Sequence, residues 1–178
     1  MIYLTQQWAS RFWIGIMGLT LCISTVQSTA SEVQTQIGKK APEWELIGLD
    51  GKNVSSDKYK GKIVILNFWA TWCPPCRAEI PDFMKLHETY KDKNVVILGV
   101  SLDSGLGPVK RFVRTQKLNY PVIMGNGDLV AKLGNFSAIP QTFIIDDEGR
   151  IHTQFQGLVK FEALEQKIKS LLGEDSKE

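Results

Sequence analysis

The sequence predicts one α/β domain that follows a short N-terminal targeting segment. Two nearly unbroken apolar runs, residues 63–69 and 95–100, are typical of strands that are buried on both faces. Between these runs, side chains recur at the spacing of a helix face: Ile80, Phe83, Met84 and His87. Residues 63–100 therefore form a strand, helix, strand unit, which is parallel and right-handed in nearly all known folds.

Composition limits the number of domains and the kind of partner. A chain of 178 residues with 43% hydrophobic residues is large enough to bury one core without disulfide staples. The 21 basic and 19 acidic side chains leave a net charge of +2, which gives no strong field to attract nucleic acid. We expect a monomer that does not bind nucleic acid.

Residues 1–30 have the composition of a targeting segment. They contain one charged side chain, Arg11, and an uncharged stretch over residues 12–26. As a helix, that stretch spans roughly 22 Å, less than the ~30 Å hydrocarbon core of a bilayer. Ser28 and Ala30 place small residues where a signal peptidase reads them. We expect a signal peptide cleaved after Ala30, or alternatively a retained membrane anchor, and in both cases a domain in the periplasm or on the outer face of the cytoplasmic membrane.

The remaining elements follow in order along the chain. Residues 31–40 are polar and aperiodic, which predicts a linker, and the domain then spans residues 41–173 before a disordered tail at residues 174–178. Asp50 and Gly51 between two apolar stretches predict an N-terminal β-hairpin. Further along we expect a helix at 108–117, a strand at 120–124, a helix at 128–133, an antiparallel hairpin of 142–145 with 151–156, and an amphipathic helix at 161–172 that Gly173 ends.

Two cysteines, Cys73 and Cys76, follow the first buried strand and carry the chemistry. If the helix begins at Pro74, Cys73 is its N-cap, and the free N–H groups of the first turn lower the pKa of its thiol. Pro74 and Pro75 have no N–H, so Cys76 alone donates to the sulfur within the first three helical residues. Cys73 is therefore the predicted attacking thiolate, with a moderately lowered pKa, and Cys76 the resolving thiol.

Other uses of a cysteine pair fit the neighbouring residues less well. A structural disulfide across two residues removes little loop entropy. Haem attachment needs a histidine where Arg77 stands, and a zinc site needs ligands beyond His87 and His152. A peroxidatic cysteine has Pro and Thr seven and three residues before it, where Cys73 has Leu66 and Ala70. We expect neither a metal nor a cofactor.

A proline far along the chain adds to this site. Pro140 precedes a buried strand, and a cis Ile139–Pro140 bond would bring its loop against the cysteine pair. The Ile139 backbone would then be free to pair with an extended substrate chain. Trp69 and Trp72 flank the end of the first strand, and we expect them to shape the surface around Cys73.

These segments resemble a known family. FWATWCPPC, AIPQTFIID and the order of elements are similar to the thioredoxin superfamily, and APEWELIGLDGK, ILGVSLD and the extra segment 104–133 resemble its extracytoplasmic TlpA/ResA/CcmG-like branch. The resemblance covers roughly residues 38–172. It implies a thioredoxin-like fold, in which helices flank a mixed sheet of four or five strands, with an N-terminal hairpin and an extra strand and helix inserted. It also implies a nucleophilic Cys73, a resolving Cys76 and a cis Pro140.

The resemblance gives Glu79 a role. Cytoplasmic thioredoxins carry a buried aspartate six residues before the first cysteine, where this chain has Asn67, which cannot titrate. Glu79 lies three residues beyond Cys76 on the same helix face and matches an acid of the branch, so it is expected to exchange a proton with Cys76. From the sequence alone, Glu79 reads equally well as an acid that favours the helix dipole.

The resemblance also implies a function. Members of the branch commonly act as reductases that keep apocytochrome c or other exported proteins reduced, with electrons from a membrane partner. We therefore expect an extracytoplasmic thiol-disulfide oxidoreductase that works as a reductase. The alternatives are a general or oxidative disulfide exchanger and a copper-carrying thiolate module, although Sco-type carriers have C-x-x-x-C and a nearby histidine.

Overall fold

The computed structural model describes residues 36–174. The predicted targeting segment, residues 31–35 of the predicted linker and residues 175–178 lie outside the described residues. Within residues 36–174, the helices are too short or too polar to cross a membrane.

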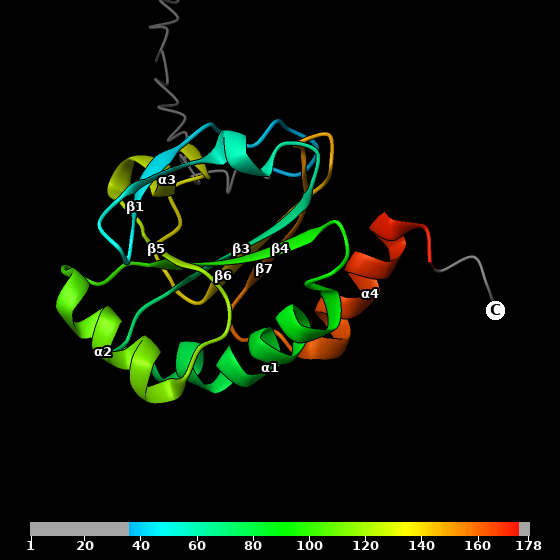
Figure 1. Cartoon of the computed structure of the whole chain (residues 1–178). Helices are drawn as coiled ribbons and strands as arrows, with labels where there is room; N and C mark the ends of the chain where they lie inside the picture. The colour runs from blue at the N-terminus through cyan, green and yellow to red at the C-terminus, as the bar shows by residue number, and fades with distance from the viewer. Residues whose placement is uncertain (1–35, 175–178) are drawn as a thin grey trace, which may run out of the picture. The chain divides into compact units, whose positions relative to one another are not determined.

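A mixed sheet forms the centre of the domain (Figure 1). In the described part of the chain it has seven strands in the order β2-β1-β5-β4-β3-β6-β7. They are β1 (Glu45–Gly48), β2 (Asn53–Ser55), β3 (Ile63–Trp69), β4 (Val95–Ser101), β5 (Val122–Met124), β6 (Gln141–Ile145) and β7 (Ile151–Gln156). The pairs β3·β4 and β4·β5 are parallel, and the other neighbours are antiparallel. Five strands match the expected sheet, and the predicted N-terminal hairpin enlarges it because β1 pairs with β5.

Helices cover both faces of the sheet. They are the 3-10 helix η1 (Ser56–Tyr59), α1 (Pro74–Tyr90), α2 (Leu106–Gln116), α3 (Gly127–Lys132) and α4 (Phe161–Leu172). Figure 1 shows α1, α2 and α4 on one face and α3 on the other. Side chains of β3 alternate between the two layers: Ile65 and Trp69 pack toward α1, whereas Leu66 and Phe68 pack on the side of α3. Both faces of β3 are buried, as its apolar run predicts.

Two helices differ in detail from the sequence prediction. In α1, Leu86 and Tyr90 are buried and His87 is only half-buried. The buried face of the helix is therefore rotated slightly from the face that the sequence predicts. Helix α2 begins two residues before Pro108, after Gly105, whose extended backbone caps it without a side-chain hydrogen bond. Pro108 is tolerated there because the first turn of a helix has no partner for its N–H groups.

The chain enters the domain at the end of the sheet opposite the cysteines. The N–H of Gly38 donates to the Ile151 carbonyl at 2.8 Å, and that of Ala41 to the Gly149 carbonyl at 2.9 Å. This β6–β7 turn lies beside the start of β3, where Val64 pairs with Ile145. At about 3.3 Å per residue, the start of β3 lies about 20 Å from its other end, which leads to the cysteines. Residues 38–40, which composition places in the linker, thus belong to the folded domain.

Candidate active site

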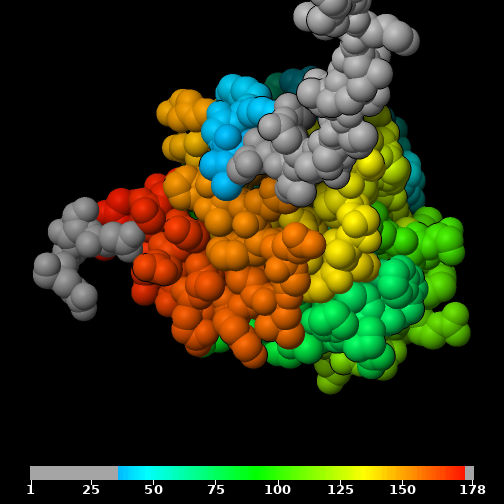
Figure 2. Space-filling view, turned by 180° about the vertical axis from the view of Figure 1, so that it is seen from behind, coloured from blue at the N-terminus to red at the C-terminus, as the bar shows by residue number. Residues whose placement is uncertain are grey.

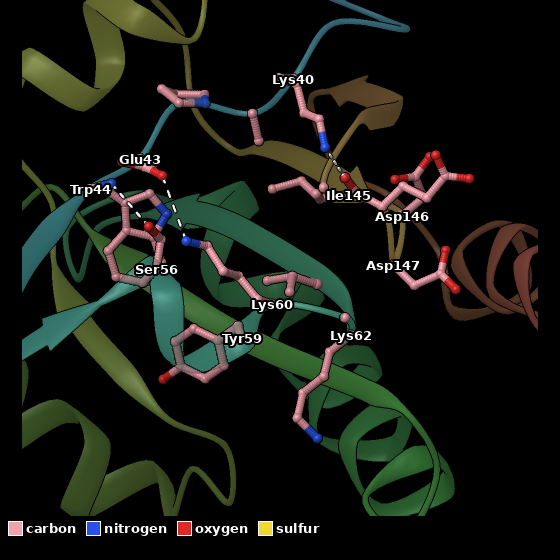
Figure 3. A pocket seen from close by; sticks show the side chains of 16 residues that line it. Lys40, Glu43, Trp44, Ser56, Tyr59, Lys60, Lys62, Ile145, Asp146 and Asp147 are labelled. Atoms are coloured by element: carbon pink, nitrogen blue, oxygen red, sulfur yellow. Dashed lines mark hydrogen bonds and ion pairs between the residues drawn. The ribbon is translucent and has the colours of Figure 1, made fainter.

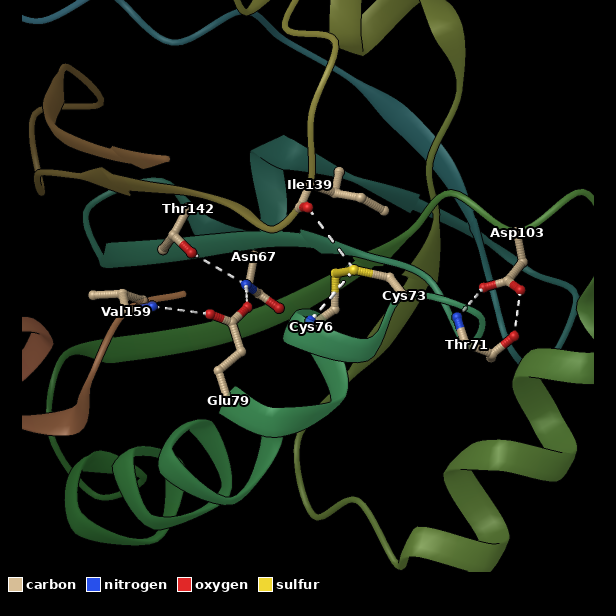
Figure 4. Close-up of a disulfide and its surroundings, with 9 residues drawn as sticks. All are labelled: Asn67, Thr71, Cys73, Cys76, Glu79, Asp103, Ile139, Thr142 and Val159. Carbon is tan, nitrogen blue, oxygen red and sulfur yellow. Dashed lines mark hydrogen bonds between the residues drawn. A yellow bond between two sulfur atoms is a disulfide. The ribbon is translucent and has the colours of Figure 1, made fainter. Parts of the chain in front are cut away.

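The cysteines lie where β3 passes into α1 (Figure 4). Cys73 is the N-cap of α1, with an extended backbone, and its Sγ accepts the N–H of Cys76 at 3.3 Å. Pro74 and Pro75 occupy the first helical positions, so the predicted cap is confirmed. The two sulfurs are joined in a disulfide whose Cα atoms are 5.3 Å apart. The described chain is therefore the oxidised form of the pair.

The predicted proline loop lies against the first cysteine. The Ile139–Pro140 bond is cis, which confirms the expectation from the resemblance. The Ile139 carbonyl oxygen lies 3.8 Å from Cys73 Sγ. Strand β6 runs antiparallel to β3 and pairs Gln141 with Phe68, so the residues before β6 meet the residues after β3. In the space-filling view this segment adjoins the start of α1 at the surface (Figure 2).

The two cysteines differ in access. Cys73 keeps 3% of its surface exposed, and Cys76 keeps none. Beside Cys73, the Trp72 side chain is 67% exposed, whereas Trp69 is fully buried with its ring 5.2 Å from that of Phe112. Of the two tryptophans expected to shape the surface, Trp72 alone does so.

Glu79 is fully buried one helical turn beyond Cys76. Its Oε1 accepts from Asn67 Nδ2 at 2.7 Å, and its Oε2 accepts the N–H of Val159 at 3.2 Å (Figure 4). Burial raises the pKa of Glu79 from 4.5 to about 7, and the hydrogen bonds from Asn67 and Val159 oppose that rise. The carboxyl therefore changes its protonation near neutral pH.

Asn67 links this acid to the sheet. In β3 it lies opposite Thr142 of β6, and its Nδ2 also donates to Thr142 Oγ1 at 3.1 Å. No sequence pattern assigned Asn67 a role, and all that was evident was that its amide cannot titrate. An amide within an otherwise apolar buried strand was the available signal, because buried polar groups require hydrogen-bond partners. Thr142 and Val159 carried no comparable signal.

A second hydrogen-bond network holds the loop before the cysteines. Asp103, just after β4, accepts the backbone N–H of Thr71 at 2.9 Å and the Thr71 hydroxyl at 2.6 Å. The Ser101 hydroxyl donates to the same carboxylate at 2.9 Å. No sequence pattern pointed to Thr71, Ser101 or Asp103 as residues of the site.

Other polar groups lie away from the disulfide. A pocket of about 510 Å³ lies at the opposite end of the sheet, beside Val64 and Ile145, and is bordered by charges of both signs such as Lys62 and Asp147 (Figure 3). His87 is half-buried on α1 and burial lowers its pKa. Across residues 36–174, His, Cys, Asp and Glu side chains form no cluster of three or more that could hold a metal ion.

Comparisons with known proteins agree with this geometry. Residues 37–154 match the AhpC/TSA family. The thiol-disulfide oxidoreductase ResA of Bacillus cereus is 35% identical over 142 residues, which cover 80% of this chain and 82% of that protein. The thioredoxin-like protein YneN of Bacillus subtilis is 37% identical over 139 residues, 77% of this chain and 81% of that protein.

A solved structure shows the same architecture. The thiol:disulfide interchange protein of the thioredoxin family from Chlorobium tepidum has a TM-score of 0.69 and 34% identity, and the match covers 75% of this chain and 96% of that chain. The family match indicates the fold, and the names of the relatives describe thiol-disulfide exchange, a chemistry that the Cys73–Cys76 disulfide fits. The chain belongs to the thioredoxin-like AhpC/TSA family and is a thiol-disulfide oxidoreductase of the ResA type.

Proposed function

We propose that this domain works outside the cytoplasm as a reductase of disulfides in exported proteins. The burial of Glu79 one turn behind Cys76 is the observation that carries the proposal. The thiolate of Cys73 attacks a substrate disulfide and releases the first substrate thiolate. Cys76 loses its proton, attacks Cys73 Sγ and releases the second, which leaves the domain oxidised and the substrate reduced by two electrons.

The contacts of Cys73 favour the reducing direction. A strong oxidant of this kind owes its high potential to stabilisation of its reduced form. Here the N–H of Cys76 is the single backbone donor to Cys73 Sγ in the described chain, because Pro74 and Pro75 have none to offer. The thiolate is therefore stabilised only moderately, and the reduced pair gives up its electrons readily.

Glu79 serves the second step. A general base works best when its pKa lies near the working pH, and burial brings the pKa of Glu79 to about 7. It accepts the proton of Cys76 as that thiol becomes the attacking thiolate. During re-reduction by a membrane electron donor, it returns a proton to Cys76.

The surface around Cys73 receives the substrate. The exposed Trp72 ring offers an apolar contact on one side of the disulfide. On the other side, Ile139 and Pro140 present backbone to an extended chain. Apocytochrome c, whose haem-binding cysteines members of the resembled branch keep reduced, is the candidate substrate.

The reduction potential tests the direction. We expect the Cys73–Cys76 pair, followed by tryptophan fluorescence in glutathione or dithiothreitol buffers, to have a midpoint below about −200 mV. A midpoint near that of strong oxidants, about −120 mV, would overturn the reductase assignment.

Trapping identifies the substrate and the roles of the cysteines. A Cys76→Ser variant cannot resolve the mixed disulfide and should accumulate covalent complexes with exported proteins, apocytochrome c among them. The Cys73→Ser variant is the matched control and should trap none. If Cys73→Ser traps partners and Cys76→Ser does not, the two roles are reversed.

The mass of the mature N-terminus distinguishes cleavage after Ala30 from a retained anchor.

A further inference from the structure

Helix α2 presents a concentration of positive charge. Lys110, Arg111 and Arg114 and the C-cap residue Lys117 are all exposed. The sequence has no acidic residue between Asp103 and Asp128 to balance them. Within residues 36–174, none of the four forms an ion pair, although basic side chains on other elements do.

This charge is continuous with the redox site. Phe112 of α2 packs against Trp69, the last residue of β3, with ring centroids 5.2 Å apart. The exposed Arg77, four residues after Cys73, places its guanidinium 5.8 Å from the centroid of the same Phe112 ring. We call the surface formed by Arg77, Lys110, Arg111, Arg114 and Lys117 the α2 basic face.

The rest of the domain does not share this charge. Outside the α2 basic face, acidic side chains outnumber basic ones among residues 36–174. Like charges that lack counter-ions raise the local potential and steer ligands of opposite sign toward the neighbouring site. An acidic segment would supply carboxylates to the arginines, which bind them in a bidentate manner.

We propose that the α2 basic face docks an acidic segment of the protein whose disulfide this domain reduces, beside the disulfide itself. The inference rests on the proposed reductase function and adds the charge of its substrate. Aspartate or glutamate side chains within a few residues of the target cysteine bind Arg77 and α2, while the cysteine reaches Cys73.

The position of the face favours a protein over a membrane surface. The chain enters the domain through residues 38–41, at the end of the sheet opposite Cys73. Figure 1 shows residues 36–40 and α2 on opposite sides of the domain. The α2 basic face therefore lies away from the residues through which the chain enters the domain.

The rates at which the reduced protein reduces two disulfide-bonded peptides test the proposal. Each contains the same disulfide-bonded core, flanked by glutamates in one peptide and by glutamines in the other. We expect the reduced protein to reduce the acidic peptide about tenfold faster at low ionic strength, and the difference to shrink as salt is added. Lys110→Glu with Arg114→Glu should abolish this preference. Lys39→Glu with Lys58→Glu is the matched control, because it makes the same change in net charge at two exposed lysines outside the α2 basic face and should retain the preference.

A binding measurement separates this proposal from the reductase function. The oxidised protein is titrated with both peptides after serine replaces their cysteines, so that no exchange takes place. Tighter binding of the acidic peptide, lost in the Lys110→Glu, Arg114→Glu variant alone, supports the docking surface even if no substrate is reduced. Equal binding of both peptides overturns it even if reduction proceeds. Binding to phosphatidylglycerol vesicles in preference to the acidic peptide also overturns it, in favour of a membrane surface.

Discussion

Asp103 holds Thr71 by two hydrogen bonds, one from the backbone N–H and one from the hydroxyl. Thr71 precedes Trp72 and Cys73, and Asp103 belongs to the segment after β4. The loop that carries the exposed tryptophan is thus fixed by a carboxylate from another part of the chain, which keeps Trp72 beside the disulfide.

We therefore expect Asp103→Ala to destabilise the domain by about 2 kcal/mol, because it removes charge-assisted hydrogen bonds from two groups of Thr71. Disulfide exchange should slow, and quenching experiments should show greater access to Trp72. Chemical denaturation and exchange kinetics measure the two effects. Thr71→Val, which keeps the backbone bond and loses the hydroxyl bond, should have about half the effect on stability. Wild-type stability and rates in Asp103→Ala would show that the loop is held by other contacts.

The pKa of Glu79 makes stability depend on pH. A carboxyl whose pKa rises from 4.5 to about 7 on folding holds its proton in the folded state and loses it in the unfolded state between these values. The free energy of unfolding therefore falls as pH rises through this window, by up to about 3 kcal/mol. We expect Glu79→Gln to lack this fall and to be the more stable protein at pH 8.

Denaturation of the oxidised protein between pH 4.5 and pH 8 measures this difference. Glu162→Gln is the control, because Glu162 is an exposed acid in the first turn of α4 and should leave the pH profile unchanged. Parallel profiles for wild type and Glu79→Gln would show that Glu79 is ionised throughout this range.

The same substitution should affect catalysis at the second step. With Glu79→Gln, the attack of Cys73 on a substrate disulfide is expected to proceed, whereas release of the mixed disulfide slows about a hundredfold at pH 7. Rapid quenching followed by mass spectrometry measures the covalent intermediate. The variant should also lose the rise in release rate near pH 7. Unchanged release would assign the proton of Cys76 to another acceptor.

A side chain at Gly99 should destabilise the domain. A Cβ there would lie 3.0 Å from Trp69 Nε1 and 3.1 Å from Tyr120 Cε2, closer than most Cβ contacts, and both of these residues are buried. We expect Gly99→Ala to destabilise the domain by about 1–3 kcal/mol. Gly107→Ala in α2 meets open space and should stabilise it by about 0.5–1 kcal/mol. Denaturation curves compare the two, and equal stability of wild type and Gly99→Ala would contradict the packing.

Local signals predicted the parts of the site that are close in sequence. An apolar strand followed by Cys-Pro-Pro-Cys was enough to place Cys73 as N-cap and to begin α1 at Pro74. Sequence alone did not place Trp69 in the core and Trp72 at the surface, because that choice depends on which face of β3 meets α1.

Local sequence patterns could not predict the hydrogen-bond partners of Glu79 and Thr71. Val159 lies 80 residues from Glu79, Thr142 lies 75 from Asn67, and Asp103 lies 32 from Thr71. Each contact exists because the strand order brings separate segments to one end of the sheet. No periodicity along the chain encodes that order.

Asn67 has a consequence for folding as well as for the site. A slip of β3 by one residue against its neighbours would send Asn67 to the α3 side, among apolar residues of other elements such as Leu129 and Phe143. The amide would lose Thr142, and Glu79 would lose a donor, at about 1–3 kcal/mol for each unsatisfied group. The hydrogen bonds that Asn67 makes with Glu79 and Thr142 thus also select one strand register over its nearest competitors. If Glu79 serves Cys76 as we propose, substitutions at Asn67 act on folding fidelity and on activity together.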